Sequence, residues 1–294
     1  MINLTPLFSI IIPLYNKARY VEATLSSITT QNLTDFEVIV VDDGSTDGSC
    51  DIVMHLAERD NRVRLLRQAN GGVSRARNTG IRAAKGTWIA FLDADDTWDS
   101  DYLQQMYELI LRHPNENLFC CTRHGRPLTM LPQECIIDDC AAWSIIFWTG
   151  TTIVRRTMFE LVAPFREGIS RGEDRDVWLR LGLATPAVLL NRELAHYTED
   201  ADGSLTATIP LEKEFPYWEW YNLPTRYPNS LRQYATNQLI ALARTQLQLG
   251  HRFTALRLVM RCRGFSDLRA RINIMIHSLC PHLAWNRINP PTVS

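Results

Sequence analysis

Apolar runs alternate with amphipathic segments along the first third of the chain. Four apolar or β-branched runs predict strands, at residues 8–15, 36–44, 62–68 and 87–93. Between them, three segments carry apolar side chains at helical spacing, at residues 17–31, 46–60 and 71–86. Strands that are apolar throughout, rather than at every second position, are typical of a parallel sheet covered by helices on both faces. The pattern therefore predicts an α/β domain.

The pattern is looser after residue 99. It predicts a helix at 101–113, a strand that runs into a helix at 150–162, and a helix with acidic residues in its first turn at 172–184. Residues 117–123 are a candidate strand, whereas residues 125–141 read as irregular.

The last part of the chain predicts helices only. Apolar residues recur at helical spacing, first at Leu231, Ala235, Leu239 and Leu242 and then at Phe253, Leu256 and Met260. A third helix of this kind is predicted at 268–281. Because residues 199–210 resemble a linker, we expect an α/β domain at 1–210 and an all-helical subdomain at 211–294.

The formal net charge of -1 conceals an uneven distribution of charge. Residues 225–294 contain ten Arg, no Lys and one acidic residue, so they carry about +9 against about -10 for the rest. Helices with apolar and arginine-rich faces can lie on an anionic membrane surface. We expect that partner rather than nucleic acid, because no nucleic-acid module is recognisable. The alternative is a helical subdomain whose basic face is solvated.

Targeting signals and cysteine chemistry are poorly supported. The amino terminus lacks the features of a secretory signal, and no apolar run approaches the ~20 residues that span a bilayer. The seven cysteines include no C-x-x-C motif, which argues against zinc and against a disulfide framework. We therefore expect a cytoplasmic protein with buried thiols, and the basic tail suggests a peripheral position on the inner face of the membrane.

Five carboxylates stand where two predicted strands end: Asp42, Asp43, Asp93, Asp95 and Asp96. Ligands of such sheets bind outside the carboxyl ends of the strands. Two carboxylates about 4 Å apart repel by roughly 4 kcal/mol, and a divalent cation such as Mg²⁺ or Mn²⁺ turns this repulsion into attraction. The alternative is a polar loop whose Asp residues cap the helix near Asp101.

Glycine spacing argues against two other classes of phosphate site. A dinucleotide-binding turn needs clustered Gly after the first strand, but none lies between Ser9 and Asp42. The G-x-x-x-x-G-K-[ST] loop of NTPases is also missing. We therefore expect a metal, rather than a glycine-rich loop, to hold phosphates.

Four segments together resemble the family 2 glycosyltransferases, inverting enzymes of the GT-A fold. They are SIIIPLYNKARYVEATLSSITTQ, FEVIVVDDGSTDGS, NGGVSRARNTGIRAAKGTWIAFLDADD and GEDRDVWLRL, and they cover roughly residues 8–200. The resemblance implies a GT-A domain, a Rossmann-like and mostly parallel sheet flanked by helices. It also implies a nucleotide-sugar donor.

The resemblance assigns five residues to the nucleotide. Pro13 and Tyr15 would contact the nucleoside. Asp43 would accept a hydrogen bond from the base, usually uracil, as a carboxylate can from a ring N–H. Asn16 and Arg77 match positions that line the donor site.

The resemblance also assigns the metal and the base. In the D-x-D signature, Asp95 would bind Mn²⁺ or Mg²⁺, and Asp93 would contact the metal or the ribose. Asp174 matches the catalytic base, with Asp176 as the next candidate. A base of this kind takes the proton from the acceptor hydroxyl, which is typically worth about 10²–10⁴-fold in rate.

The expected enzyme adds one sugar at a time. The chain lacks the Q-x-x-R-W motif and the transmembrane helices of processive synthases that resemble this family. We therefore expect transfer from a UDP-sugar to a saccharide or lipid-linked acceptor in cell-surface polysaccharide synthesis. A Mg²⁺-dependent nucleotidyltransferase would need a Gly- and Arg-rich loop after the first strand. A non-catalytic sugar-nucleotide binding module would lack the metal or base carboxylate.

Two further groups of residues have a structural and a functional interpretation. Four aromatic residues could stack against acceptor sugars, namely Trp143, Phe147, Trp148 and Trp178, but we favour core packing. His196 could be a late metal ligand, and here we favour a structural histidine.

Overall fold

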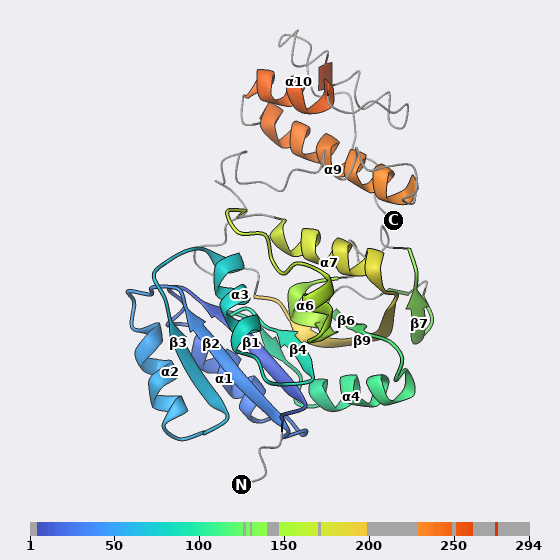
Figure 1. Cartoon of the computed structure of the whole chain (residues 1–294). Coiled ribbons are helices and arrows are strands. Elements are labelled where there is room, and N and C mark those ends of the chain that lie inside the picture. The colour runs from blue at the N-terminus through green and yellow to red at the C-terminus, as the bar shows by residue number, and fades with distance from the viewer. Residues whose placement is uncertain are drawn as a thin grey trace. The chain divides into compact units, whose positions relative to one another are not determined.

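The computed structural model describes residues 5–125, 128–129, 131–139, 147–169, 172–198, 229–248, 251–260 and 274–275 (Figure 1). Its contacts divide into two compact units, Met1–Phe215 and Pro216–Ser294. The predicted domain boundary after residue 210 lies outside the described residues.

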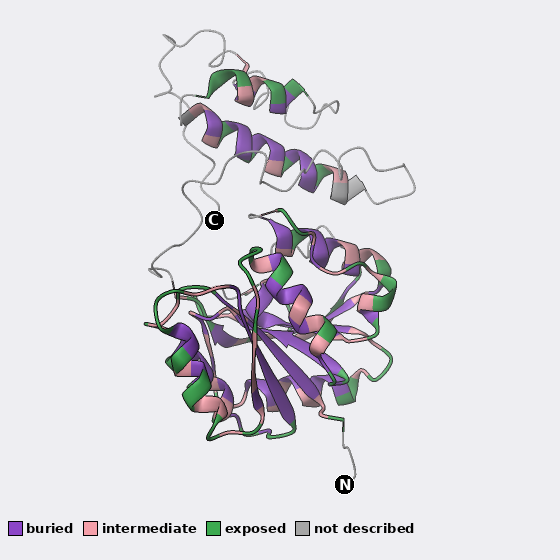
Figure 2. Ribbon diagram, turned by 60° about the vertical axis from the view of Figure 1, so that its left-hand side comes forward, coloured by how far each residue is buried: buried purple, intermediate pink, exposed green. Residues whose placement is uncertain are grey.

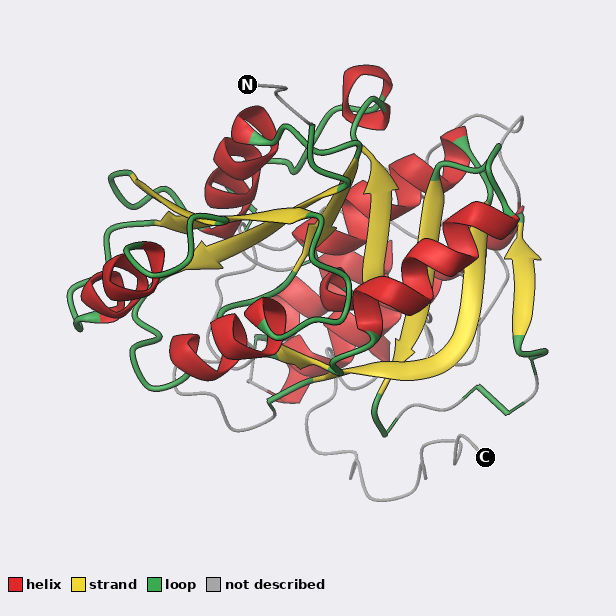
Figure 3. Cartoon of the chain, turned by 90° about the horizontal axis from the view of Figure 1, so that it is seen from below, coloured by secondary structure: helices red, strands yellow, loops and turns green. Residues whose placement is uncertain are grey.

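Strands and helices alternate up to Phe91, as the apolar pattern predicts. The elements are β1 (Phe8–Leu14), α1 (Val21–Thr29), β2 (Phe36–Asp42), α2 (Ser49–Ala57), β3 (Val63–Arg67), α3 (Val73–Ala83) and β4 (Trp88–Phe91). The four strands are parallel, in the order β3-β2-β1-β4. All seven residues of β2 are buried, because helices lie on both sides of the strands (Figure 3).

The second half of the sheet is mixed. Its elements are β5 (Thr97–Trp98), α4 (Tyr102–Arg112), β6 (Leu118–Arg123), β7 (Glu134–Ile137), the 3₁₀ helix η1 (Thr149–Thr151), β8 (Thr152–Arg155), α6 (Met158–Leu161), α7 (Glu173–Ala184) and β9 (Ala187–His196). β8 is antiparallel to β4 and β6, whereas β9 is parallel to β6. The carboxyl ends of β1, β2, β4, β6 and β9 therefore lie along one edge of the sheet.

The sequence pattern does not predict β5, β7 or β9. β5 and β7 are short strands that pair only with β9, and both pairings are antiparallel. β7 falls within residues 125–141, so the irregular assignment of that stretch is wrong at Glu134–Ile137. Strand formation depends on neighbouring strands more than on the residues themselves, so short strands of this kind leave little local signal.

The central strands contribute to two cores, one on each face of the sheet. On β1, Ile10 and Ile12 pack with residues of α1 and α2, whereas Ile11 packs with residues of α3 and α7. Figure 2 shows the buried strands between helices whose outer sides are exposed. Full burial of one such side chain is worth about 1.5–3 kcal/mol, so the strands anchor the loops at their ends.

Gly80 lets α3 approach β1 closely. A Cβ atom at this position would lie 2.3 Å from Cγ2 of Ile11, which is too close for any real contact. The close approach sets the position of α3, and with it the position of Arg77, relative to the strand ends.

Two of the four aromatic residues considered for acceptor binding belong to the core. Trp178 is 2% exposed and packs edge-on against Phe91 and Phe165, and Phe147 is also buried. Core packing is confirmed for these two residues. Trp148 is half-buried, and Trp143 lies outside the described residues.

The second unit contains α9 (Asn229–Gln248) and α10 (Arg252–Met260), which pack against each other. On α9, Ala235, Leu239 and Leu242 are buried, as their spacing predicts. Of the predicted helix at 268–281, only Ile274 and Met275 are described. None of the described helices combines the length and the apolar content that crossing a bilayer requires.

The predicted apolar stripe of α10 is wrong, because none of its three residues is buried. The side chains that α10 buries are Ala255, Leu258 and Val259. Phe253 and Met260, which the spacing places in the core, are instead 88% and 62% exposed. Local spacing cannot tell which of two apolar faces a short helix turns inward, because that depends on its packing partner.

Candidate functional site

The predicted acidic motifs lie together at the carboxyl edge of the sheet. β1 and β2 pair in register up to Leu14 and Asp42, and the N–H of Asp43 donates to the carbonyl of Leu14 at 2.8 Å. Asp93 and Asp95 follow β4, the other neighbour of β1. The two motifs therefore flank the end of the same central strand.

Two cationic side chains pair with the D-x-D carboxylates. Nη2 of Arg77 lies 2.8 Å from Oδ1 of Asp93. Nζ of Lys17 lies 2.7 Å from Oδ2 of Asp95, and each of these two side chains is 18% exposed. Lys17 is a site residue that the sequence did not predict. Its position, two residues after Tyr15 in the first loop at this edge, is the signal that could have identified it.

Asp93, Asp95 and Asp96 form an acidic cluster, and Asp96 is the fully buried one of the three. Its Oδ1 accepts a hydrogen bond from the N–H of Thr198 at 2.9 Å, and its Oδ2 has no partner among the described residues. Burial, and then the charges of Asp93 and Asp95, raise the pKa of the Asp96 carboxyl to about 8. Crowded carboxylate oxygens of this kind are the ligands that hard divalent cations prefer, so the residues fit Mg²⁺ or Mn²⁺.

The alternative interpretation, in which Asp residues of this loop cap the helix near Asp101, is not observed. The residue directly before α4 is Asp101, whose side chain makes no capping bond to a described residue. Its carboxylate instead pairs with Arg192 at 3.0 Å. The carboxylates of the D-x-D motif thus lie at the sheet edge and do not cap the helix.

Arg77 joins the D-x-D motif to the predicted base. It is 3% exposed, and its Nη1 donates to Oε1 of Glu173 at 2.9 Å while Nη2 donates to Asp93. Burial alone would lower the pKa of the guanidinium, but the charges of Asp93 and Glu173 raise it above its ordinary value. Breaking a buried pair of this kind typically costs about 3–5 kcal/mol. The contact of Arg77 with the donor stays a prediction.

Asp174 lies at the amino terminus of α7, directly after Glu173. Gly172 precedes the helix with φ 78°, a left-handed conformation that favours glycine. Asp174 is half-buried, and its Oδ1 accepts a hydrogen bond from the N–H of Arg175 at 2.8 Å. Its carboxylate is therefore reachable from solvent, as a base that receives a proton from an acceptor must be.

Asp176, the second candidate for the base, has a structural role. It is fully buried, its Oδ2 accepts from Nη2 of Arg180 at 2.7 Å, and its Oδ1 lies 3.5 Å from Arg166. Arg180 also donates to the carbonyl of Pro164 at 2.8 Å, so this pair fixes α7 to the preceding loop. The structure thus removes Asp176 as an alternative base.

The first loop carries the residues assigned to the nucleoside. Tyr15, directly after β1, is 49% exposed, and Pro13 is half-buried. Asn16 has φ 51°, a left-handed conformation that Asn tolerates better than most residues. Its Oδ1 accepts from the N–H of Thr46 at 2.8 Å, and its own N–H donates to Oγ of Ser45 at 3.0 Å. Asn16 therefore ties the first loop to the loop after β2, and its donor contact stays a prediction.

Asp43 holds the loop between β3 and α3. Its carboxylate accepts hydrogen bonds from Nε2 of Gln68 at 2.7 Å and from the N–H groups of Gly71 and Gly72 at 3.0 and 2.8 Å. A base N–H would have to share one of these oxygens. The assignment of Asp43 to the base stays a prediction.

His196 belongs to a hydrogen-bonded cluster with Asp99 and His124. Its Nε2 lies 2.7 Å from Oδ1 of Asp99, and Nε2 of His124 lies 3.2 Å from Oδ2. The ligand atoms are close enough to hold a metal ion, within 4.8 Å of one another. However, the two rings are stacked, with centroids 3.8 Å apart and planes 10° apart. One ion cannot lie in both ring planes, so shared coordination would require one imidazole to turn.

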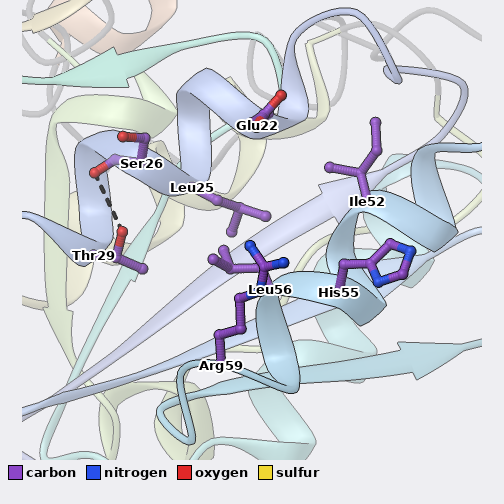
Figure 4. A pocket seen from close by; sticks show the side chains of 8 residues that line it. All are labelled: Glu22, Leu25, Ser26, Thr29, Ile52, His55, Leu56 and Arg59. Carbon is purple, nitrogen blue, oxygen red and sulfur yellow. Dashed lines mark hydrogen bonds between the residues drawn. The ribbon is translucent and has the colours of Figure 1, made fainter.

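A groove of about 530 Å³ lies between α1 and α2, away from these residues (Figure 4). It is lined by the apolar side chains of Leu25, Ile52 and Leu56 and by charged or polar ones such as Glu22 and Arg59. None of the predicted site residues contributes to it.

The comparisons with known proteins find glycosyltransferases. The family model described as Glycosyl transferase family 2 matches residues 9–131. The chain is 32% identical over 189 residues to the putative teichuronic acid biosynthesis glycosyltransferase TuaG of Bacillus subtilis (strain 168), covering 62% of this chain and 74% of TuaG. It spans 30% or less of the length of three other curated relatives.

Two solved structures resemble the chain along most of its length. TarS of S. aureus, in complex with UDP-GlcNAc, has a TM-score of 0.63 at 19% identity, covering 92% of this chain and 81% of TarS. The mannosyltransferase PcManGT of Pyrobaculum calidifontis, in complex with GDP-Man and Mn²⁺, has a TM-score of 0.57 at 19% identity, covering 94% and 81%. At these identities the likeness establishes the fold, and the expected GT-A fold is confirmed. The sequence match to TuaG over most of its length, the family model and the fold together show that the chain belongs to glycosyl transferase family 2.

Proposed function

We propose that the chain is an inverting, metal-dependent glycosyltransferase that moves one sugar from a UDP-sugar to a hydroxyl of a saccharide or lipid-linked acceptor. The observation that carries the proposal is the double pairing of Arg77. This one buried guanidinium binds Asp93 of the D-x-D motif and Glu173, the neighbour of Asp174. The proposed site for the leaving group is thereby linked to the neighbour of the proposed base, which supports a single displacement at an anomeric carbon.

In the proposed reaction, Asp174 takes the proton from the acceptor hydroxyl as that oxygen attacks the anomeric carbon. The bond from this carbon to the diphosphate oxygen breaks in the same step, and its electron pair leaves with the nucleotide diphosphate. The configuration inverts because attack and departure occur on opposite faces. No covalent intermediate on the protein is needed, so one base is sufficient.

Asp95 and Asp93 are the residues that would hold the divalent cation. Once bound, a divalent cation supplies positive charge against the charge that develops on the diphosphate. Asp96 supports this assignment, because its buried Oδ2 has no partner among the described residues. The half-exposed Tyr15 and the half-buried Pro13 are on the same edge, where the nucleoside would lie.

The comparisons support a nucleotide-sugar donor. TarS is described in complex with UDP-GlcNAc and PcManGT in complex with GDP-Man and Mn²⁺. TuaG is named for teichuronic acid biosynthesis, which supports a polysaccharide pathway for this chain. We propose UDP rather than GDP because the resemblance of the Asp43 segment implies a uracil reader.

Calorimetric titration with UDP and with GDP, in Mn²⁺ and in EDTA, tests the proposal. We expect UDP binding in Mn²⁺ that weakens about 10-fold or more in EDTA or in Asp95→Asn, since a charged contact is worth about 1.5–3 kcal/mol. Asp101→Asn is the matched control, because its carboxylate lies outside the cluster. Equal UDP affinity of Asp95→Asn and the wild type in Mn²⁺ would reject the metal site. Absence of nucleotide binding would reject the function.

We further propose that the protein acts at the inner face of the membrane, where its basic second unit contacts anionic lipid. On α10, Arg252, Phe253, Arg257 and Met260 are exposed, which combines basic and apolar side chains on one short helix. Such a surface is suited to the interface between lipid headgroups and water.

A further inference from the structure

Three side chains lie together beside the D-x-D motif, namely Arg123, Trp148 and Tyr197. We call this group the aromatic platform. Tyr197 packs edge-on against Trp148, with ring centroids 5.6 Å apart. The guanidinium carbon of Arg123 lies 5.0 Å from the centroid of Tyr197 and 5.8 Å from that of Trp148. Arg123 ends β6, Trp148 precedes β8 and Tyr197 follows β9, so all three lie at the carboxyl edge of the sheet.

The Trp148 side of the platform is held rigidly. The carbonyl of Trp148 accepts hydrogen bonds from the N–H of Thr151 at 3.0 Å and from the hydroxyls of Thr151 and Thr152 at 2.9 Å each. A Cβ atom at Gly150 would lie 2.8 Å from the indole, so the ring packs directly against the backbone there. The ring is therefore preorganised rather than placed by a ligand.

Tyr197 connects the platform to the proposed donor site. The next residue, Thr198, donates its N–H to Asp96 and its hydroxyl to the carbonyl of Asp95. Burial, and then the charges of Asp96 and Asp95, raise the pKa of the Tyr197 phenol. Tyr197 is nevertheless 41% exposed, so one part of its ring is open to a ligand.

Arg123 differs from the paired arginines of the site. Arg77 and Arg180 donate to carboxylates, whereas the guanidinium of Arg123 has no hydrogen bond or ion pair to any residue in the described part of the chain. It is half-buried against two aromatic rings, and its charge partly offsets the rise in the pKa of the Asp96 carboxyl. Guanidinium groups bind carboxylates and phosphates through two parallel hydrogen bonds.

We infer that the aromatic platform is the acceptor subsite and that it takes a saccharide carrying a negative charge. This inference rests on the proposed function, which requires an acceptor close to the D-x-D motif and to Asp174. An acceptor sugar stacks its apolar C–H face on Tyr197, and its carboxylate or phosphate pairs with Arg123. A neutral sugar makes only the first of these contacts.

Saturation-transfer NMR on the full chain, with UDP and Mn²⁺ present, tests the inference. The probes are glucuronic acid, glucose 1-phosphate and glucose, which separate a carboxylate, a phosphate and no charge. For the wild type we expect one or both anionic sugars to bind about 10-fold more tightly than glucose, the worth of one charged hydrogen-bonded pair. Arg123→Gln should abolish this preference. Arg192→Gln, an exposed arginine on β9 that pairs with Asp101, is the matched control.

The ring and the charge are tested separately. Tyr197→Ala should weaken all sugars about 5-fold or more, whereas Tyr197→Phe should bind them like the wild type, because the stacking face is kept. Thermal unfolding monitors whether each variant is folded. UDP affinity in Mn²⁺ should stay within about 2-fold of wild type in all four variants, since a 2-fold change is only ~0.4 kcal/mol.

Three results would overturn the inference. Equal binding of the three sugars by the wild type would show that no anion site is present. A charge preference that survives Arg123→Gln would place that site elsewhere. Loss of UDP affinity in Arg123→Gln would make Arg123 a donor residue. Failure of the wild type to bind UDP would instead count against the proposed function, so the two failures are distinguishable.

Discussion

At the scale of single residues, the two D-x-D carboxylates are neutralised in different ways. Arg77 is 3% exposed and bound to two carboxylates, so removing it would leave the buried Glu173 and the partly exposed Asp93 without their partner. Lys17 pairs with Asp95 where both side chains keep some contact with water. We expect a divalent cation to displace Lys17, which pairs with Asp95 in this partly exposed place, more readily than Arg77, which is buried between two carboxylates.

The first prediction concerns the competition between Lys17 and the cation. Lys17→Met should bind Mn²⁺ more tightly than the wild type by roughly 5-fold, because Asp95 is no longer shared with an ammonium group. Calorimetry with Mn²⁺ alone measures this. Lys85→Met, an exposed lysine outside the cluster, is the control. Unchanged or weaker Mn²⁺ binding would show that Lys17 does not compete for Asp95.

The second prediction concerns the base. Asp174→Asn is nearly isosteric, so it should keep UDP binding and lower turnover by about 10²-fold or more. The measurements are UDP calorimetry and transfer to the true acceptor. If turnover fell less than ~5-fold, the base would lie elsewhere. Asp176 and Glu173 are both buried and each is paired with an arginine, so neither would be the first replacement to test.

At the scale of elements, one buried carboxylate joins the sheet at the end opposite the site. Glu37 of β2 accepts hydrogen bonds from Ser9 of β1 at 2.7 Å, from the N–H of Lys85 at 2.7 Å and from Arg64 of β3 at 2.8 Å. The hydroxyl of Ser9 in turn accepts from the N–H of Gly86 at 2.8 Å. Three strands and the loop before β4 are therefore tied together, which helps the opposite edge keep its strand ends in place.

The third prediction is a pH dependence of stability. Burial alone would raise the pKa of the Glu37 carboxyl, but the bonds from Ser9, Lys85 and Arg64 lower it below the ordinary value of 4.5. Because the folded-state pKa is the lower one, this carboxylate stabilises the fold above pH 4.5, and the stabilisation is lost as the pH falls through the folded-state pKa.

Glu37→Gln tests this dependence. It should lower the free energy of unfolding by about 2 kcal/mol at neutral pH, and the difference in Tm from the wild type should shrink as the pH falls below 4.5. The exposed Glu22→Gln variant is the control and should show neither effect. A difference in Tm that is constant across this range would show that the Glu37 charge is not involved.

At the scale of the whole molecule, the balance of basic and acidic residues differs between the two ends of the chain. Residues 225–294 contain ten arginines and one acidic residue. In the described part of that segment, Phe253 and Met260 are exposed, as are Arg252 and Arg257. Each basic residue near an anionic lipid surface is worth on the order of 1 kcal/mol. A few of them on one face are enough for binding at low salt.

The fourth prediction is that the second unit binds anionic vesicles. The full chain should float with anionic but not with neutral vesicles, and a chain that ends at Phe215 should float with neither. Salt should weaken the binding, since the Debye length falls from ~10 Å at 0.1 M to ~3 Å at 1 M. Phe253→Ser should reduce whatever binding survives at high salt. Equal flotation of the full chain with anionic and neutral vesicles would contradict the prediction.

The sequence by itself determined the order of the first seven elements and the place of the acidic motifs. Burial on both faces leaves its mark in each strand separately, as in the continuous apolar run of β2. A carboxylate that directly follows such a strand must emerge at the carboxyl edge, so Asp43, Asp93 and Asp95 could be placed without any long-range information. Asp174 follows no strand, and its assignment as the base comes only from the resemblance to the family.

Only the tertiary structure decided which of these side chains meet. Arg77 and Glu173 are 96 residues apart in the chain, and neither their spacing nor their periodicity predicts the pair that joins the D-x-D motif to the base. The platform of Arg123, Trp148 and Tyr197 depends on the pairing of β6 with the antiparallel β8 and the parallel β9. The short strands β5 and β7 also pair with β9. Periodicity records which face of an element is buried, because neighbouring residues share that face. Contacts between distant residues depend instead on which strand ends the sheet brings together, and that is a property of the whole fold.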